Sequence, residues 1–224
     1  MMNHKMNVPQ MEIMDIPLLK YPQVQVAALR VEHLCVEHWL TGTGSPISQH
    51  RKQHALLFLQ EKDRQRSVGA TLVLDHLLHK HQLQEKDMLY AENSAHKPYF
   101  KNYPQLHFNL SHSGAYAIAA LAEVPVGIDI QATTGYQRDL ARLCMSASEI
   151  EEIEACDPTK WDTLFTHLWC LKEAVLKAVG TGISEEEFPK FTLTAGMPQL
   201  EDDRYAALHT QLLAWQKYSI GIAF

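Results

Sequence analysis

Two stretches decide the fold of this chain: GIDIQ at residues 127–131 and FTHLWCLKEAVLKAVGTGIS at residues 165–184. In the first stretch, apolar residues alternate with Gly127, Asp129 and Gln131. This alternation predicts a strand, and it places the side chains of Asp129 and Gln131 on the same face. Two oxygen-bearing side chains are therefore expected side by side.

The second stretch predicts a long helix. Its apolar stripe runs from Leu164 to Val179, and Glu173 and Lys177 lie one turn apart on the opposite side. If that side meets the strand, the Glu173 carboxylate joins Asp129 and Gln131. These oxygen ligands suit magnesium, which prefers one or two carboxylates together with water and substrate phosphate oxygens. Lys177 would add positive charge toward a phosphate.

Each stretch also has a simpler interpretation. Glu173 four residues before Lys177 is the favoured order of a surface ion pair, which stabilises a helix by about 0.3–0.5 kcal/mol. Asp129 is harder to explain in this way, because an unpaired buried carboxylate costs several kcal/mol unless a cation or hydrogen bonds accompany it. The two stretches in this order and at this spacing are more specific than either alone.

Two further segments precede these stretches, HKPYF at residues 96–100 and HFNLSHSG at residues 107–114. The four segments in order resemble motifs of the 4′-phosphopantetheinyl transferases of the surfactin-synthetase-activating type. GIDIQ resembles the family pattern G-[IV]-D-[IV]-E, and residues 169–180 match W-x-x-K-E-[AS]-x-x-K-x-x-G. The other two segments resemble the family's G-K-P and F-N-[IL]-S-H-S motifs, so the resemblance covers most of the chain.

The resemblance implies an α+β fold, in which two similar α/β halves form a pseudo-twofold arrangement and each half is a small, mainly antiparallel sheet packed with helices. We expect an N-terminal half at residues 1–124 that contacts coenzyme A. A C-terminal half at residues 125–224 would carry magnesium and the catalytic helix. A weak internal sequence similarity agrees with two similar halves, because AYAIAALAEVPVGIDI joins the halves and the similar YSIGIAF ends the chain.

The implied activity is transfer of the 4′-phosphopantetheine arm of coenzyme A to a serine of an apo acyl or peptidyl carrier protein. The reaction releases 3′,5′-ADP and depends on magnesium. It is the holo-[acyl-carrier-protein] synthase reaction, which serves fatty acid or secondary metabolite biosynthesis. The alternative is a non-catalytic carrier- or coenzyme-binding pseudoenzyme, because Gln131 stands where the family pattern has glutamate.

By the resemblance, Asp129, Glu173 and Gln131 hold the magnesium, Gln131 either directly or through water. Glu173, or a water on the metal, accepts the serine proton. Lys177, together with Lys172, stabilises or protonates the departing phosphate.

The remaining motif residues would bind coenzyme A, with Ser111 and His112 on a turn between strands and a protonated His112 at the adenosine 3′-phosphate. Arg66 is preferred to Arg64 for that phosphate. His50 and Gln53 stand where the family's first helix has lysines, for which Arg51 and Lys52 are candidate replacements. The expected coenzyme-binding set is Arg66, Lys97, Pro98, Ser111, His112 and Lys172.

Composition bounds the partners and the compartment. The net charge of −6 argues against a general nucleic-acid binder. Carrier proteins tend to be acidic, so we expect a local apolar and basic docking surface, placed around the motif helix and the GTGISEEEF loop. The four cysteines form no C-x-x-C pair, and no signal peptide or membrane-spanning run is evident. A cytoplasmic monomer without a membrane partner is expected.

Local signals predict several element boundaries. Ser146 with Glu149 forms a capping-box pattern, and Gly180 with Gly182 is expected to end the long helix. The other expected features are Ser45 and Pro46 at the start of one helix, Asp63 as the cap of a helix running through Leu78, and a second sheet made from residues 191–194, part of residues 204–215, and residues 218–224.

Overall fold

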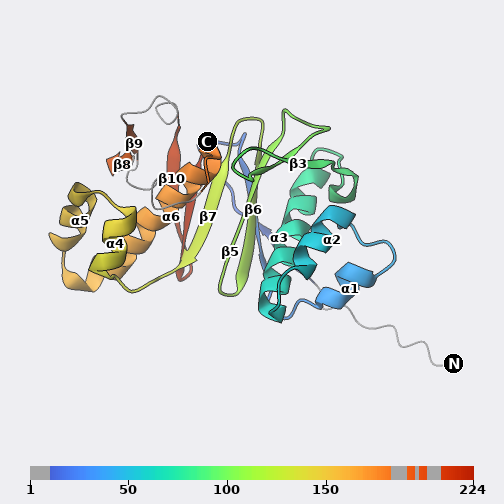
Figure 1. Ribbon diagram of the computed structural model, residues 1–224, viewed down its shortest axis with the longest axis horizontal. Helices are drawn as coiled ribbons and strands as arrows, with labels where there is room; N and C mark the ends of the chain where they lie inside the picture. The colour runs from blue at the N-terminus through green and yellow to red at the C-terminus, as the bar shows by residue number, and fades with distance from the viewer. Residues whose placement is uncertain (1–10, 183–190, 195–196, 201–207) are drawn as a thin grey trace.

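The computed structural model describes residues 11–182, 191–194, 197–200 and 208–224. Figure 1 shows helices on the two outer sides of the molecule and strands in the centre. Helix α3 covers one sheet and helix α6 covers the other, while the two sheets pack against each other. The order of layers is therefore helix, sheet, sheet, helix.

The first half contains a four-stranded antiparallel sheet in the order β1-β2-β6-β5. Strands β3 and β4 pair separately as a small hairpin. The elements are β1 (Ile13–Asp15), β2 (Gln25–Arg30), α1 (Val36–Thr41), α2 (Gln49–Leu56), α3 (Glu61–His79), the short 3₁₀ helix η1 (Glu85–Asp87), β3 (Tyr90–Glu92), β4 (Pro98–Phe100), β5 (His107–Ser113) and β6 (Tyr116–Ala122).

The second half contains a three-stranded antiparallel sheet in the order β10-β11-β7. Strands β8 and β9 again form a separate hairpin. The elements are β7 (Gly127–Ala132), α4 (Arg138–Cys144), α5 (Ala147–Glu154), η2 (Pro158–Lys160), α6 (Trp161–Val179), β8 (Phe191–Thr194), β9 (Met197–Leu200), β10 (Thr210–Trp215) and β11 (Tyr218–Ala223).

The two halves repeat one topology. In the first half, β2, α3, β5 and β6 follow in order, and the strands pair as β5-β6-β2. In the second half, β7, α6, β10 and β11 follow in order, and the strands pair as β10-β11-β7. Helices α3 and α6 each have 19 residues. The predicted α+β fold of two similar halves is confirmed, and the echoing segments YAIAALA and YSIGIA are the equivalent strands β6 and β11.

Strand β6 explains how the halves are held together. All seven of its residues are buried. Ala117, Ala119 and Leu121 face the cluster around α3, and the alternate residues from Ile118 to Ala122 face the cluster between the two sheets. After Tyr116 the strand contains only alanine, isoleucine and leucine, and a continuous apolar run of this kind is what a strand buried on both faces requires.

Strands β5 and β7 meet without a backbone ladder between them. Instead, side chains at every second position of β5 accept hydrogen bonds from the backbone of β7. This spacing follows from the two-residue period of a strand, which places all three acceptors on one face. The bonds run from Ile128 N–H to Asn109 Oδ1 (2.9 Å), from Ile130 N–H to Ser111 Oγ (3.3 Å) and from Ala132 N–H to Ser113 Oγ (3.1 Å).

Helix α6 lies unusually close to its sheet. A Cβ atom on Gly127 would collide with the carbonyl oxygen of Ala174, and one on Gly221 would lie 2.5 Å from the carbonyl oxygen of Cys170. Only glycine permits this approach. The first residue of GIDIQ therefore brings the motif helix directly onto β7.

Several boundary predictions were right. The capping box of Ser146 and Glu149 is confirmed. Gly180 ends α6 with φ 77°, as expected for a glycine cap.

No helix within the described ranges is long and apolar enough to cross a membrane.

Other boundary predictions were wrong. Helix α2 is capped by Ser48 and not begun by Ser45, because the Ser48 amide and hydroxyl both donate to the buried carboxylate of Glu85, at 2.6 and 2.8 Å. Helix α3 begins at Glu61, so Asp63 lies inside its first turn, where it pairs with Arg66. Strand β8 pairs with β9 and is not part of the sheet containing β10 and β11.

Candidate active site

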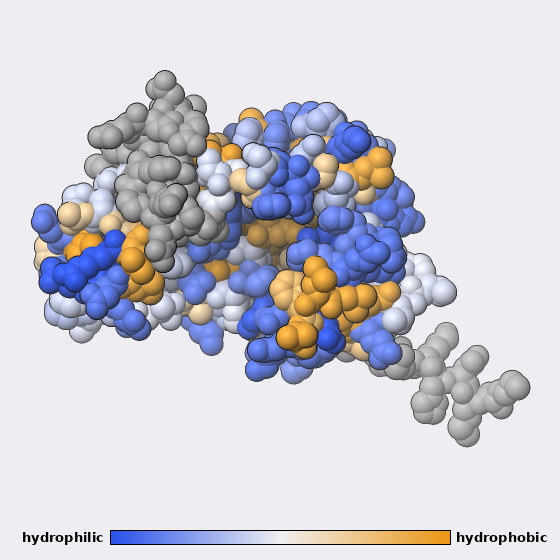
Figure 2. All heavy atoms as spheres, in the orientation of Figure 1, coloured by the Kyte–Doolittle hydropathy of each residue, from blue (hydrophilic) through white to orange (hydrophobic). Residues whose placement is uncertain are grey.

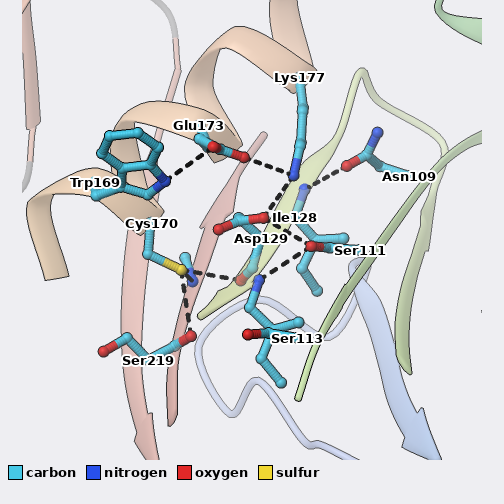
Figure 3. A network of polar contacts seen from close by, with 12 residues as sticks. Asn109, Ser111, Ser113, Ile128, Asp129, Trp169, Cys170, Glu173, Lys177 and Ser219 are labelled. Carbon is cyan, nitrogen blue, oxygen red and sulfur yellow. Dashed lines mark hydrogen bonds and ion pairs between the residues drawn. The ribbon is translucent and has the colours of Figure 1, made fainter. Parts of the chain in front are cut away.

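Three charged side chains meet where α6 crosses β7. Asp129 is on β7, and Glu173 and Lys177 are on the side of α6 that faces it (Figure 3). The Lys177 ammonium donates to Asp129 Oδ1 at 2.6 Å and to Glu173 Oε2 at 3.1 Å. The side chain of Asp129 is 5% exposed, that of Glu173 is 16% exposed and that of Lys177 is 18% exposed. The predicted meeting of the two motifs is therefore present.

Asp129 is held by one carboxylate oxygen and leaves the other without a donor. Its Oδ1 accepts from the Ser111 hydroxyl at 2.7 Å as well as from Lys177. Its Oδ2 is buried and has no hydrogen-bond donor among the residues that the structure describes. A buried carboxylate oxygen without a donor is costly unless a cation faces it. Oδ2 is thus the atom best suited to bind a metal.

The environment shifts the pKa values of the two α6 residues. Burial, followed by the negative charge of Asp129, raises the pKa of Glu173, although Lys177 and the indole N–H of Trp169 (2.9 Å) oppose the shift. Burial lowers the pKa of Lys177, but Asp129 and Glu173 outweigh it, so the net shift is upward. Lys177 therefore stays charged, and Glu173 is a stronger base than an exposed glutamate.

The donor set fits magnesium and not a metal that needs a dense protein cage. In the described part of the chain, no three His, Cys, Asp or Glu side chains gather to form a metal site. Magnesium needs only one or two carboxylates, because water and substrate phosphates complete its shell. Asp129 and Glu173 meet that need. Gln131 lines the same cleft, and its amide N–H donates to Thr134 Oγ1 at 3.4 Å.

The cluster opens into a cleft of about 400 Å³ between the two halves, on the face shown in Figure 2. Both halves contribute to the cleft, as expected when an active site is completed by packing two similar units. The polar lining residues are Arg51, His54, Ser67, Asn109, Ser111 and His112 from the first half, and Asp129, Gln131, Glu173 and Lys177 from the second.

The structure places Ser111 and His112 on strand β5 and not on the following turn, which corrects the expected location. The Ser111 hydroxyl is fully engaged within the protein, donating to Asp129 and accepting from Ile130 N–H. Burial, together with the charges of Arg66 and Lys177, lowers the pKa of His112. The shift favours a neutral imidazole when no phosphate is beside it, and a protonated His112 at the adenosine 3′-phosphate stays a prediction.

Arg66 lies beside the main cleft. It donates to the Gly114 carbonyl at 3.1 Å and pairs with Asp63 at 2.9 Å. With Lys62 and Lys217 it lines an adjoining hollow of about 460 Å³. Arg64 instead donates to the carbonyls of Phe58 and Leu59, so its guanidinium binds the connection between α2 and α3 and does not face the cleft.

Lys97 ties the two halves together. Its ammonium donates to the Val126 carbonyl at 3.2 Å and to the Ala178 carbonyl at 2.9 Å, near the end of α6. Burial lowers the pKa of Lys97 to about 8. Pro98, the next residue, lines the main cleft, so this segment reaches the site from the first half.

The structure does not bring Lys172 to the site. Its side chain is fully buried and pairs with Glu149 of α5 at 2.9 Å. One step along a helix turns a side chain by about 100°, so the residue before Glu173 faces α5 and not the cleft. The predicted contact of Lys172 with coenzyme or leaving group does not agree with this placement.

Two contributions to the site were not evident from the motifs. Arg51 is 7% exposed and lines the cleft, with Nε donating to Thr71 Oγ1 at 3.0 Å. The sequence signalled it only as a basic residue near missing lysines. The thiol of Cys170 donates to the carbonyls of Asp129 (3.2 Å) and Ser219 (3.3 Å) and accepts from Gly221 N–H (3.1 Å), which fixes β7 under α6 (Figure 3).

Two family models match this chain. One, described as 4′-phosphopantetheinyl transferase, N-terminal, matches residues 35–124. The other, described as 4′-phosphopantetheinyl transferase superfamily, matches residues 125–223. The two matches together span residues 35–223 and leave strands β1 and β2 outside.

Curated relatives have the same family name. The chain is 32% identical to 4′-phosphopantetheinyl transferase Sfp of Bacillus subtilis over 139 residues, which are 62% of each protein. It is 29% identical to 4′-phosphopantetheinyl transferase psf-1 of Bacillus pumilus, over 72% of this chain and 69% of that protein. The match to Sfp thus spans less than two thirds of its length. The holo-[acyl-carrier-protein] synthase of Thermotoga maritima aligns with a TM-score of 0.37 at 23% identity, over 45% of this chain and 61% of that one.

Proposed function

Because this chain belongs to the 4′-phosphopantetheinyl transferase superfamily, we propose that it transfers the 4′-phosphopantetheine arm of coenzyme A to a serine of an apo acyl or peptidyl carrier protein. 3′,5′-ADP is the second product. The observation that carries the proposal is the cluster of Asp129, Glu173 and Lys177, in which a buried carboxylate oxygen has no donor among the described residues. The cluster lies in a cleft lined by both halves.

In the proposed reaction, the serine oxygen forms a bond to the phosphorus that bears the pantetheine arm, and the bond from that phosphorus to the oxygen of the leaving 3′,5′-ADP breaks. Asp129 and Glu173, with Gln131 beside them, would hold magnesium. When bound, magnesium neutralises charge on pyrophosphate oxygens and on the leaving group.

Glu173 is the proposed base for the serine proton. Its Oε1 accepts a hydrogen bond from the Trp169 indole and its Oε2 pairs with Lys177, so the carboxylate is held in one position beside Asp129. Lys177 remains charged beside it and offers an ammonium to the departing phosphate. These two residues supply the proton acceptor and the positive charge that the transfer requires.

We assign coenzyme binding mainly to residues 1–124, and the cation and base to residues 125–224. Buried Arg51 suits a phosphate, because it has no carboxylate within ion-pair distance among the described residues. His112 lies in the same cleft, and Arg66 lies beside it. The assigned set is Arg51, Arg66, Lys97, Pro98, Ser111 and His112, with Ser111 acting through Asp129. One chain supplies both sides of the cleft, which is consistent with a monomer.

The test is intact-mass analysis of purified apo acyl carrier proteins and apo peptidyl carrier domains, after incubation with this protein, coenzyme A and magnesium. The proposal expects one phosphopantetheine arm per carrier, loss of the product when a chelator is added, and a matching release of 3′,5′-ADP. Coenzyme binding without any modified carrier would instead indicate the pseudoenzyme. The carriers that react would separate a fatty-acid role from a secondary-metabolite role.

A further inference from the structure

The connection between α2 and α3 exposes a group of leucines. Leu56, Leu57 and Leu59 are 60%, 78% and 94% exposed, and the half-buried Phe58 lies between them. Other large apolar side chains that are exposed in the described chain lie apart from one another in sequence. Single exposed leucines are ordinary, but a contiguous group of apolar side chains marks an interaction surface. We call Leu56, Leu57, Phe58 and Leu59 the α2–α3 patch.

The backbone that presents this patch is fixed. The Arg64 guanidinium donates to the Phe58 carbonyl at 2.8 Å and to the Leu59 carbonyl at 3.5 Å. The Phe58 ring packs edge-on against His54, with centroids 5.4 Å apart. The leucines are therefore held outward on a rigid turn, which lowers the entropy cost of binding a partner.

The patch adjoins the mouth of the catalytic cleft. His54 and Phe58 line the same cleft as Asp129 and Glu173. In Figure 2, an apolar area lies on this face beside the hollow between the halves, over the end of α2 and the start of α3. A macromolecule that delivers a serine to the cluster must rest on a surface bordering this mouth.

Charge distinguishes the α2–α3 side of the molecule from the α4–α5 side. Residues 49–66 carry five Lys or Arg, of which Arg51 is buried, and two Asp or Glu, while the rest of the chain carries fifteen and twenty-four. Residues 138–154, which include α4 and α5, carry two Lys or Arg and five Asp or Glu, of which Glu149 is buried and paired with Lys172. An acidic partner is therefore attracted to the α2–α3 side and repelled from the α4–α5 side.

We propose that the α2–α3 patch, with the basic residues around it, is the docking surface for the acidic carrier protein that brings the acceptor serine. This inference rests on the proposed transferase function. Apolar side chains next to the serine would cover Leu57 and Leu59, and carboxylates on the carrier would face Lys52 and Lys62. It replaces the expected location around the motif helix and the GTGISEEEF loop, most of which lies outside the described residues.

The experiment measures carrier modification by intact mass at varied carrier concentration and saturating coenzyme A. The variant is Leu57→Glu/Leu59→Glu, which changes only exposed side chains. Two controls replace other exposed leucines: Leu19→Glu on the β1–β2 connection (92% exposed) and Leu143→Glu on α4 (47% exposed). Coenzyme A affinity, measured by calorimetry, should be the same for all four proteins.

We expect kcat/KM for the carrier to fall by about tenfold or more in the double variant, the size of effect seen when apolar anchors of an interface are replaced. Neither control should change it. Lys62→Glu should lower kcat/KM most at low salt. An unchanged kcat/KM in the double variant, or a loss in Leu143→Glu instead, would overturn the docking inference. Loss of self-association in the double variant without a change in kcat/KM would also overturn it. Failure of the wild-type protein to modify any carrier would refute the transferase proposal itself.

Discussion

Ser111 offers a sharp test of how the site is organised. Its hydroxyl donates to Asp129 Oδ1 at 2.7 Å and accepts from Ile130 N–H at 3.3 Å. Ser113, two residues later on the same strand, accepts from Ala132 N–H at 3.1 Å, and no hydrogen bond joins it to Asp129. Ser113→Ala is therefore a matched control for Ser111→Ala.

The structure separates two effects of these changes. Each variant leaves one strand amide without its side-chain acceptor, at a cost of about 1–3 kcal/mol in unfolding free energy. Only Ser111→Ala also removes a hydrogen bond to a carboxylate, worth about 1.5–3 kcal/mol. Because a partner of a metal ligand typically contributes 10- to 100-fold in metal affinity, divalent-cation binding should weaken by about tenfold in Ser111→Ala and stay unchanged in Ser113→Ala.

The assay is titration with Mn²⁺ in the presence of coenzyme A, following free Mn²⁺ by electron paramagnetic resonance. Urea unfolding of the same proteins reports the stability loss. Equal Mn²⁺ affinity in the two variants would refute the idea that Ser111 positions Asp129, even if both proteins lost stability.

Three further predictions concern residues around the site. Lys172→Met should destabilise the protein by about 3–5 kcal/mol, because it removes the cation that pairs with the buried Glu149 carboxylate. Lys172→Met/Glu149→Leu also removes the buried carboxylate, but it loses the capping box with Ser146, so it should recover only part of that loss; equal urea midpoints for the single and double variants would contradict this. Burial lowers the pKa of Lys97 from its usual 10.5 to about 8. Below pH 8 the buried side chain is charged, and the cost of burying that charge lowers the unfolding free energy in full. Between pH 8 and 10.5 the folded protein holds Lys97 neutral, so this cost decreases as the pH rises. The unfolding free energy of the wild-type protein should therefore rise relative to Lys97→Met between these pH values, and a constant difference would exclude the shift. Gln131→Glu adds a carboxylate to the cation site, so half-saturation of activity by magnesium should occur at about threefold or more lower concentration; an unchanged magnesium curve would place residue 131 outside the site.

Local periodicity accounts for what the sequence could predict. The alternation in GIDIQ and the stripe of the motif helix predicted β7 and α6, and the one-turn spacing of Glu173 and Lys177 placed both on the side facing Asp129. The fold class also followed from the resemblance, with the repeated strand pattern in agreement. These signals lie within single elements or in their order along the chain.

The failures involve partners that are distant in sequence. Lys172 faces Glu149, 23 residues earlier, and nothing in the motif reveals which helix covers that side of α6. Ser48, and not Ser45, caps α2 because its amide and hydroxyl donate hydrogen bonds to Glu85, 37 residues away. The role of Ser111 depends on the side-chain junction between β5 and β7, which no local pattern encodes.

The most direct test of the central claim is the rate of holo-carrier formation by Glu173→Gln, measured by intact mass alongside the wild-type protein. Coenzyme A binding by calorimetry controls for a misfolded site. Removal of the proposed base should slow transfer by at least about 10²-fold, with coenzyme A still bound. Transfer at the wild-type rate by Glu173→Gln would contradict the assignment of this cluster as the catalytic centre.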